Sequence, residues 1–160
     1  MAVQKTNVMR ILDKNKINYE VITYDISDDK IDGISVAEKT GQDMKEVYKT
    51  LVTQGVSREL YVFVIPVDKE LDLKKAAKSV NEKSIEMLKS ANLLSLTGYI
   101  HGGCSPIGMK KQFKTIIDIS SSNKDKIFIS GGKIGYQIEI ELNDLRKVID
   151  FELQDITKED

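Results

Sequence analysis

The segment Gly102-Gly103-Cys104-Ser105-Pro106-Ile107-Gly108 has the composition of a backbone that contacts a ligand. Its glycines allow main-chain conformations that other residues avoid, and they let a ligand approach the backbone closely. The proline holds the turn in shape, and successive N–H groups of such a turn can converge on a phosphate or a carbonyl oxygen. The same composition is also typical of a plain turn. A binding role for this loop therefore depends on what lies beside it.

Two side chains that could take part in catalysis or binding occur in strand-like runs earlier in the chain. Lys49 interrupts the run VYKTLV, so its ammonium either faces solvent or points into a pocket, where it would bind a phosphate or polarise an ester. Tyr24 ends the run YEVITY and either brings a phenol to the same pocket or is a half-buried aromatic residue.

A second glycine-rich turn, Ser130-Gly131-Gly132-Lys133-Ile134-Gly135, follows much later. It is not a P-loop, because no Gly-Lys-Ser/Thr sequence opens a helix there. It is either a hairpin turn only, or a turn whose Ser130 and Lys133 reach the first glycine-rich loop if the flanking strands adjoin.

Lysines gather at two places. Lys74 and Lys78 lie one helical turn apart beside Lys75, where like charges cost stability unless an anion binds or solvent screens them. Lys110 and Lys111 follow the first glycine-rich loop directly, with Lys114 close behind. Basic residues next to the segment best suited to contact a ligand favour a phosphate-bearing partner.

The chain has one cysteine and one histidine, which excludes an internal disulfide and makes a zinc or iron site improbable, because such sites draw on clusters of these residues. We therefore expect no metal and no cofactor. A Ser-His-Asp triad would have to use His101, and a lone histidine is usually structural. Cys104 is either a nucleophile or a small buried residue, and without a base beside it the second interpretation is favoured.

Length and composition describe one ordinary domain. The 160 residues are 41% hydrophobic and 31% charged, with a net charge of −1, so a polyanion would have to meet a local basic patch. No apolar run approaches the roughly 20 residues that cross a bilayer, and Met1–Asn15 lacks the apolar block of a signal peptide. We expect one α+β domain over residues 1–160, in the cytoplasm.

The expected elements alternate without a regular βαβ rhythm, which favours an α+β fold with a mixed sheet. Capping residues and apolar periodicity predict helices at Thr6–Asn15, Ser35–Thr40, Leu73–Val80, Ile85–Ser90 and Asn143–Ile149. Asp25–Gly33 is expected to be a loop. Strands are expected at Tyr19–Tyr24, Val47–Thr53, Leu60–Pro66, Thr97–His101, Lys114–Ile119, Ile127–Ser130, Tyr136–Glu141 and Phe151–Ile156.

Five ordered blocks resemble the YbaK/EbsC family of aminoacyl-tRNA deacylases, which is related to the editing domain of bacterial prolyl-tRNA synthetases. The blocks are ITYD, YKTLV, LKKAAKS, TGYIHGGCSPIGMKK and SGGKIG, and together they run nearly end to end. The resemblance is strongest to the free-standing YbaK type. It implies a strongly curved mixed sheet flanked by helices, and removal of cysteine from Cys-tRNA(Pro). A pocket shaped for proline cannot strongly exclude a similar or smaller amino acid, so a second site edits the error.

The resemblance also implies roles for individual residues. Lys49 and Tyr24 would act at the aminoacyl-adenosine end while the substrate's own thiol attacks its ester and leaves as a thiolactone. Gly102, Gly103, Ser105, Pro106, Gly108 and Ser130 would bind the aminoacyl group, with main-chain N–H groups facing the developing oxyanion. Lys110, Lys111, Lys74 and Lys78 would contact tRNA. Prolyl-tRNA synthetase is the expected partner.

Two other functions stay open on sequence alone. One is a deacylase for alanine or another small amino acid on tRNA(Pro), which would need an activated water in place of the substrate thiol. The other is a non-catalytic module that binds tRNA or a nucleotide. Neither the amino-acid and tRNA specificity nor the oligomeric state follows from the sequence.

Overall fold

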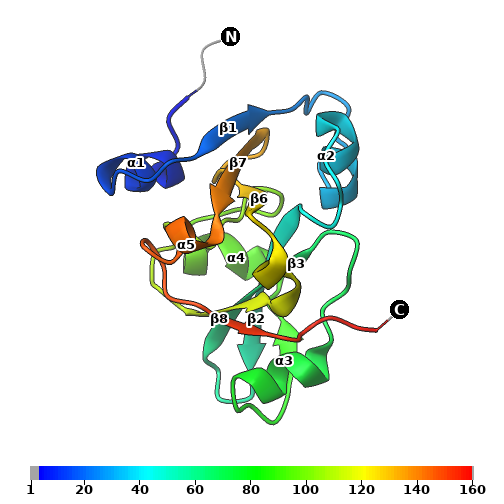
Figure 1. The fold of residues 1–160 in the computed structure, drawn as a ribbon. Helices are drawn as coiled ribbons and strands as arrows, with labels where there is room; N and C mark the ends of the chain where they lie inside the picture. The colour runs from blue at the N-terminus through cyan, green and yellow to red at the C-terminus, as the bar shows by residue number, and fades with distance from the viewer. Residues whose placement is uncertain (1–3, 160) are drawn as a thin grey trace.

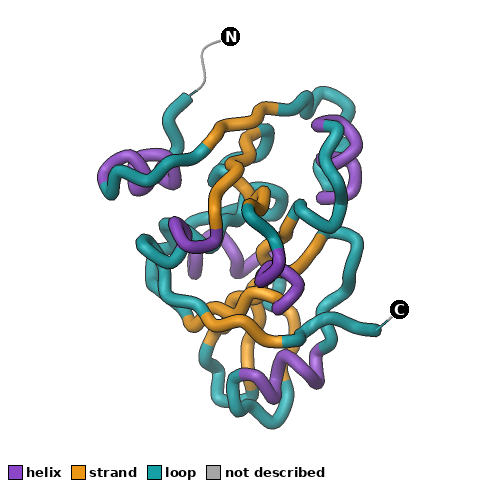
Figure 2. The backbone as a smooth tube through the Cα atoms, viewed as in Figure 1, coloured by secondary structure: helices purple, strands orange, loops and turns teal. Residues whose placement is uncertain are grey.

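The strands form two sheets, seen in a computed structural model that describes residues 4–159 (Figures 1 and 2). The smaller sheet is antiparallel and has the order β1 (Glu20–Thr23), β7 (Tyr136–Glu141), β6 (Lys126–Ser130). The larger sheet is mixed and has the order β4 (Ile85–Met87), β2 (Tyr48–Gly55), β3 (Leu60–Pro66), β5 (Lys114–Asp118), β8 (Glu152–Gln154). An isolated parallel bridge between Val47 and Phe128 joins the start of β2 to β6 and so connects the two sheets.

Side-chain caps begin three of the helices. Thr6, Asp32 and Asp72 accept hydrogen bonds from main-chain N–H groups in the first turns of α1 (Asn7–Lys14), α2 (Gly33–Thr40) and α3 (Leu73–Ser79). Such caps satisfy donors that a helix start leaves free. α4 (Ser90–Thr97), α5 (Leu142–Leu145) and the 3-10 helix η1 (Ile119–Asn123) complete the helical elements.

The continuous apolar run of β3 is explained by burial on both faces. Tyr61, Phe63 and Ile65 face a core closed by α3, whereas Val62 and Val64 alternate with them and face the central core. That core also holds isoleucines of β6 and β7 and the apolar side of α1, so it lies between the two sheets. A strand buried on both faces needs no polar alternation.

The predicted α+β class and mixed sheet are confirmed, and most predicted elements are found within a few residues of their expected bounds. The division of the strands between two sheets was not predicted. No helix among residues 4–159 is both long enough and apolar enough to cross a membrane.

The predicted helix from Ile85 to Ser90 is wrong. Residues 85–87 form β4, which pairs with β2 so that Ile85 is opposite Gly55, and α4 begins only at Ser90. The segment IEML fits either period, and pairing with the open edge of β2 decides in favour of the strand.

The predicted strand from Thr97 to His101 is also wrong. Thr97 is the last residue of α4, and Gly98 ends the helix in the left-handed conformation at φ +88°. A glycine in this conformation is a common helix stop. The glycine-rich loop therefore follows a helix end and not a strand.

Candidate active site

A cavity of about 70 Å³ opens between α2, the start of β2 and the small sheet. Space of this size holds roughly five water-sized groups, which suits a small side chain and its ester and not a nucleotide. Three residues predicted for the site line it together: Tyr24, Lys49 and Ser130. The other lining residues are Gly33, Val36, Val47, Tyr48, Val67, Ile129, Tyr136 and Gln137.

The register of the small sheet places one wall of this cavity. Gln137 on β7 is opposite Ile22 on β1 and Ser130 on β6, so all three side chains lie on one face of the sheet. This face is turned toward α2, because Val36 of α2 lines the cavity and Gln42, just after α2, donates a hydrogen bond to Gln137.

Lys49 brings the only ammonium among the cavity-lining residues. It is half-buried, and within residues 4–159 its side chain makes no hydrogen bond and no ion pair. Burial lowers the pKa of Lys49 below its usual value, while the charges of Glu70 and Asp68 act in the opposite direction. Lys49 therefore lines the cavity while part of its side chain stays exposed to solvent. An ammonium without a partner beside a cavity is available to a ligand.

The second glycine-rich turn holds Tyr24 and Ser130, the other two predicted residues at the cavity, by hydrogen bonds. The Tyr24 N–H donates to the carbonyl oxygen of Gly135 at 3.1 Å, and the Gly132 N–H donates to Ser130 Oγ at 3.1 Å. Ser130 therefore accepts from its own turn and keeps its hydroxyl hydrogen for another partner. Tyr24 and Ser130 are brought to the cavity by the same turn.

The first glycine-rich loop lies beside this turn but is absent from the cavity lining. A Cβ built on Gly103 would stand 3.1 Å from the nitrogen of Ile134, so the two loops touch backbone to backbone. Gly102 has φ +89° and packs against Ile134 and Ile31, and Gly108 has φ +81° and packs against Tyr99. The two glycine-rich loops therefore adjoin through their backbones, whereas the Lys133 ammonium donates to Gln4 Oε1 and Ser130 Oγ accepts from its own turn.

Two of the loop residues predicted to contact the substrate have buried side chains. Ser105 is fully buried, and its Oγ accepts a hydrogen bond from the Ile107 N–H, so it shapes the turn. Pro106 is buried as well. In the described part of the chain, the main-chain N–H groups of Gly102, Cys104 and Ser105 have no acceptor. These are the donors that the loop has left for a ligand.

Cys104 has the properties of a structural residue. Its thiol is buried in the central core, and burial raises its pKa to about 12. A thiol with so high a pKa is scarcely ionised near neutral pH and is a poor nucleophile. His101 is exposed on the loop surface.

The basic residues predicted to contact tRNA fall into two separate groups. Lys110 and Lys111 are exposed beside the glycine-rich loop, and the Lys110 ammonium donates to the Ser95 carbonyl at the end of α4. Lys74 and Lys78 are exposed on α3, which Figure 1 shows at the opposite end of the molecule from β1 and β7. The structure therefore brings Lys110 and Lys111, but not Lys74 and Lys78, toward the loops of the site.

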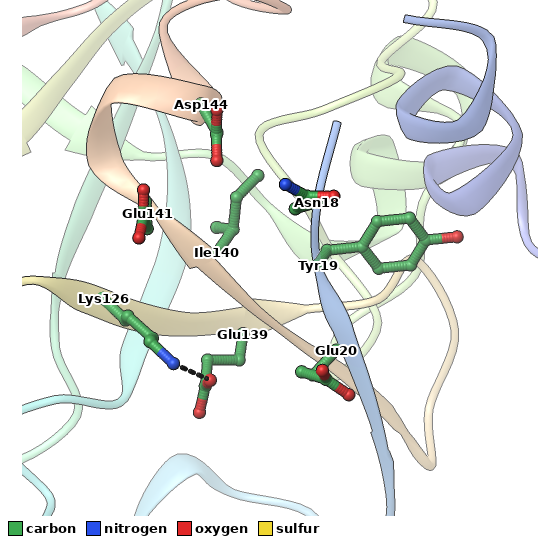
Figure 3. Close-up of a pocket in the computed structure, with 8 residues that line it drawn as sticks. All are labelled: Asn18, Tyr19, Glu20, Lys126, Glu139, Ile140, Glu141 and Asp144. Atoms are coloured by element: carbon green, nitrogen blue, oxygen red, sulfur yellow. Dashed lines mark hydrogen bonds and ion pairs between the residues drawn. The ribbon is translucent and has the colours of Figure 1, made fainter. Parts of the chain in front are cut away.

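A second, wider pocket on the small sheet is acidic and is a poor site for RNA (Figure 3). Glu20, Glu139, Glu141 and Asp144 line it, and its single lysine, Lys126, is paired with Glu139 at 3.0 Å. Carboxylates repel phosphates, so this pocket does not suit a phosphate-bearing ligand.

Sequence reasoning missed Gln137, Tyr48 and Val36 at the cavity. In the run YQIEIE, Gln137 shares the face of two glutamates, which indicates solvent. Residues of α2, the start of β2 and Val67 share the cavity with Gln137, which is buried with 3% of its surface exposed. The signal in the sequence was that Gln137 is uncharged, whereas the two other residues on that face of the strand are glutamates.

With this geometry in place, comparison with known proteins defines the class. The family described as "Aminoacyl-tRNA editing domain" matches residues 32–148. The chain belongs to this family. Tyr24 lies outside the matched range, although the structure places it at the same cavity as Lys49.

A curated relative from Enterococcus faecalis carries the name "Putative Cys-tRNA(Pro)/Cys-tRNA(Cys) deacylase EbsC". It is 46% identical over 137 residues, which cover 86% of this chain and 84% of that protein. A crystal structure described as "a putative trans-editing enzyme for prolyl tRNA synthetase" has the same fold, with a TM-score of 0.83, 19% identity and coverage of 98% and 100%. The crystal structure of "hypothetical protein APE2540" is similar to the same degree, with a TM-score of 0.83, 18% identity and coverage of 96% and 100%.

Proposed function

We propose that the protein is a trans-acting aminoacyl-tRNA deacylase that removes cysteine from mischarged Cys-tRNA(Pro). The observation that carries this proposal is the unpaired, half-buried ammonium of Lys49 at a cavity of about 70 Å³. The 46% identity to a relative named as a Cys-tRNA(Pro)/Cys-tRNA(Cys) deacylase supports the choice of cysteine.

The cleavage step uses the thiol of the substrate. The sulfur attacks the ester carbonyl carbon, a carbon–sulfur bond forms, and the ester carbon–oxygen bond to the ribose breaks. The thiol proton ends on the ribose oxygen, which leaves free tRNA and a cyclic thiolactone that water later opens. A cysteine thiol of ordinary pKa, about 8.5, is partly ionised near neutrality, and holding it beside the ester supplies the proximity that the reaction needs.

The residues of the cavity assist this step without acting as a base. None of the described lining residues is His, Asp or Glu, and in this mechanism Lys49 acts as an ammonium and not as a base. The Lys49 ammonium stabilises negative charge on the sulfur and then on the carbonyl oxygen. Tyr24 positions the terminal adenosine, and Ser130 donates from its free hydroxyl hydrogen.

The rest of the tRNA stays outside the cavity. We place the acceptor stem along the side that carries Lys110 and Lys111, because these exposed lysines adjoin the glycine-rich loop. The free N–H groups of Gly102, Cys104 and Ser105 face the aminoacyl end or the terminal phosphate. Prolyl-tRNA synthetase is the proposed partner, and the cytoplasm, where charged tRNA is used, is the proposed location.

A panel of charged tRNAs tests the proposal. Cysteine, serine and alanine on tRNA(Pro), together with cysteine on tRNA(Cys), would be incubated with the protein, and ester loss and the released product would be measured. We expect rapid loss of cysteine as its thiolactone, with no effect of a chelator. Rapid release of alanine or serine would instead support the water-dependent alternative. Binding of tRNA with an unchanged ester lifetime would identify a non-catalytic module and overturn the proposal.

A further inference from the structure

The side-chain amide of Gln137 is a polar group at the cavity to which the mechanism above gives no role. Gln137 is 3% exposed and lines the cavity. Its Oε1 accepts a hydrogen bond from Gln42 Nε2 at 2.7 Å. Its Nε2 donates to no atom of residues 4–159. This nitrogen is not fully buried, so a ligand can reach it. The end of the amide that remains for a ligand is therefore the donor end.

The neighbours of Gln137 are donors too. Ser130 is its direct cross-strand partner, and its hydroxyl hydrogen is free because its oxygen already accepts from Gly132. Lys49 adds an ammonium. A wall with three donors and no lining carboxylate is complementary to an electron-rich atom, and in an aminoacyl ester the carbonyl oxygen has this character.

Gln42 determines which end of the Gln137 amide faces the cavity. The main chain at Gln42 is held by a hydrogen bond from its N–H to the Ala37 carbonyl at 3.0 Å, just after the left-handed Gly41 that ends α2. The Gln42 side chain uses its nitrogen toward Gln137, and its own Oε1 is buried without a partner. Within residues 4–159, the hydrogen bond to Gln137 is therefore the one polar contact that the Gln42 side-chain amide makes.

We propose that Gln137 Nε2 donates a hydrogen bond to the ester carbonyl oxygen of the substrate, and that Gln42 is the positioning residue that presents this donor. The proposal rests on the function proposed above. Negative charge grows on the carbonyl oxygen as the sulfur attacks, so the hydrogen bond strengthens toward the transition state. Removal of one such donor typically lowers kcat by about 10²–10³-fold.

Isosteric changes at Gln42 test the orientation directly. A carboxylate at this position accepts and does not donate, so Gln42→Glu turns the Gln137 nitrogen toward α2 and its oxygen toward the cavity. We expect kcat on Cys-tRNA(Pro) to fall at least about 10-fold with KM nearly unchanged. Gln42→Met removes the hydrogen bond without reversing the amide and should cost less. Gln137→Met, which has no donor, should cost the most.

Two further measurements separate this proposal from folding and from the proposed function. Thermal unfolding identifies any variant that fails to fold. If Gln42→Glu does not fold, Gln42→Met is compared with the wild type in its place. Calorimetric binding of 3′-cysteinylamino-adenosine, which keeps the carbonyl oxygen but has an amide in place of the ester, is measured for all variants. If the wild type does not deacylate but Gln137→Met weakens this binding, the proposed function fails and the role of Gln137 stands. Folded Gln42→Glu and Gln137→Met variants with wild-type kcat and binding would overturn the proposal.

Discussion

Gly103 and Ile134 are in backbone contact across the two glycine-rich segments: a Cβ on Gly103 would lie 3.1 Å from the Ile134 nitrogen and 3.3 Å from Lys133 Cα. The first segment supplies the unpaired N–H groups, and the second holds Tyr24 and Ser130 at the cavity. Close packing of the two backbones is therefore what couples the loop to the cavity.

Gly103→Ala should separate these two segments. The added methyl group meets backbone atoms that cannot rotate away, so we expect a loss of about 1–3 kcal/mol in unfolding free energy and a clear fall in kcat/KM. Asp72→Ala is the control, because it removes the N-cap of α3 at the other end of the molecule and costs a similar amount, about 1 kcal/mol. Equal activity in the two variants would argue against the coupling.

Lys49→Met should change activity and stability in opposite directions. The methionine keeps the apolar stem but removes a half-buried charge that has no partner, so the melting temperature should stay the same or rise. We expect single-turnover deacylation to fall by about 10²-fold or more. A variant that retains wild-type turnover would show that the ammonium does not act in the reaction.

Asp68→Asn should shift the pH profile of deacylation. Burial lowers the pKa of Lys49, and the negative charge of Asp68 opposes that effect. In the proposed mechanism the active form of Lys49 is the ammonium, so activity should fall as the pH rises through the pKa of Lys49. Loss of the Asp68 charge lowers this pKa further, and the alkaline limb of the profile should move to lower pH. A shift to higher pH, or none, would contradict this electrostatic coupling.

Cys104→Ala should retain nearly full activity. The thiol is buried with a pKa of about 12, and in the proposed mechanism the reactive sulfur belongs to the substrate. In the wild type, alkylation of Cys104 by iodoacetamide at pH 8 should be slow until the protein is unfolded. A folded but inactive Cys104→Ala variant would rule out the substrate-thiol route.

Replacement of the substrate sulfur by oxygen should abolish cleavage. A serine hydroxyl is far less acidic than a thiol, and the cavity lining has no His, Asp or Glu to take its proton. Seryl-tRNA(Pro) should therefore keep its spontaneous ester lifetime in the presence of the protein, measured beside the cysteinyl form. Comparable rates for the two esters would show that water is the nucleophile.

Much of the fold follows from local sequence. Thr6, Asp32 and Asp72 act as N-caps, and Gly41 ends α2 in the left-handed conformation. The β2–β3 hairpin and the β6–β7 hairpin follow from apolar runs around turn residues. Such features depend on residues near one another in the chain, so pattern and capping suffice to predict them.

What the sequence did not reveal depends on distant partners. Residues 85–87 became a strand because β2 had an open edge, and Gln137 became buried beside residues of α2, the start of β2 and Val67. Of the site, the grouping of Tyr24, Lys49 and Ser130 was predicted. The substrate contact predicted for Ser105 stays a prediction: its hydroxyl is used within its own turn, and its main-chain N–H is the group that remains for such a contact.

The small size of the cavity has a consequence for how the enzyme chooses among tRNAs. A chamber of about 70 Å³ admits the amino acid and excludes the anticodon, the elbow and almost all of the acceptor arm. In the proposed function, the contacts made inside the cavity are therefore limited to the amino acid and the 3′ end that every tRNA shares. Correctly charged tRNA bearing the same amino acid is chemically identical at that point, so its survival depends on where the enzyme acts and on which proteins reach the charged end first.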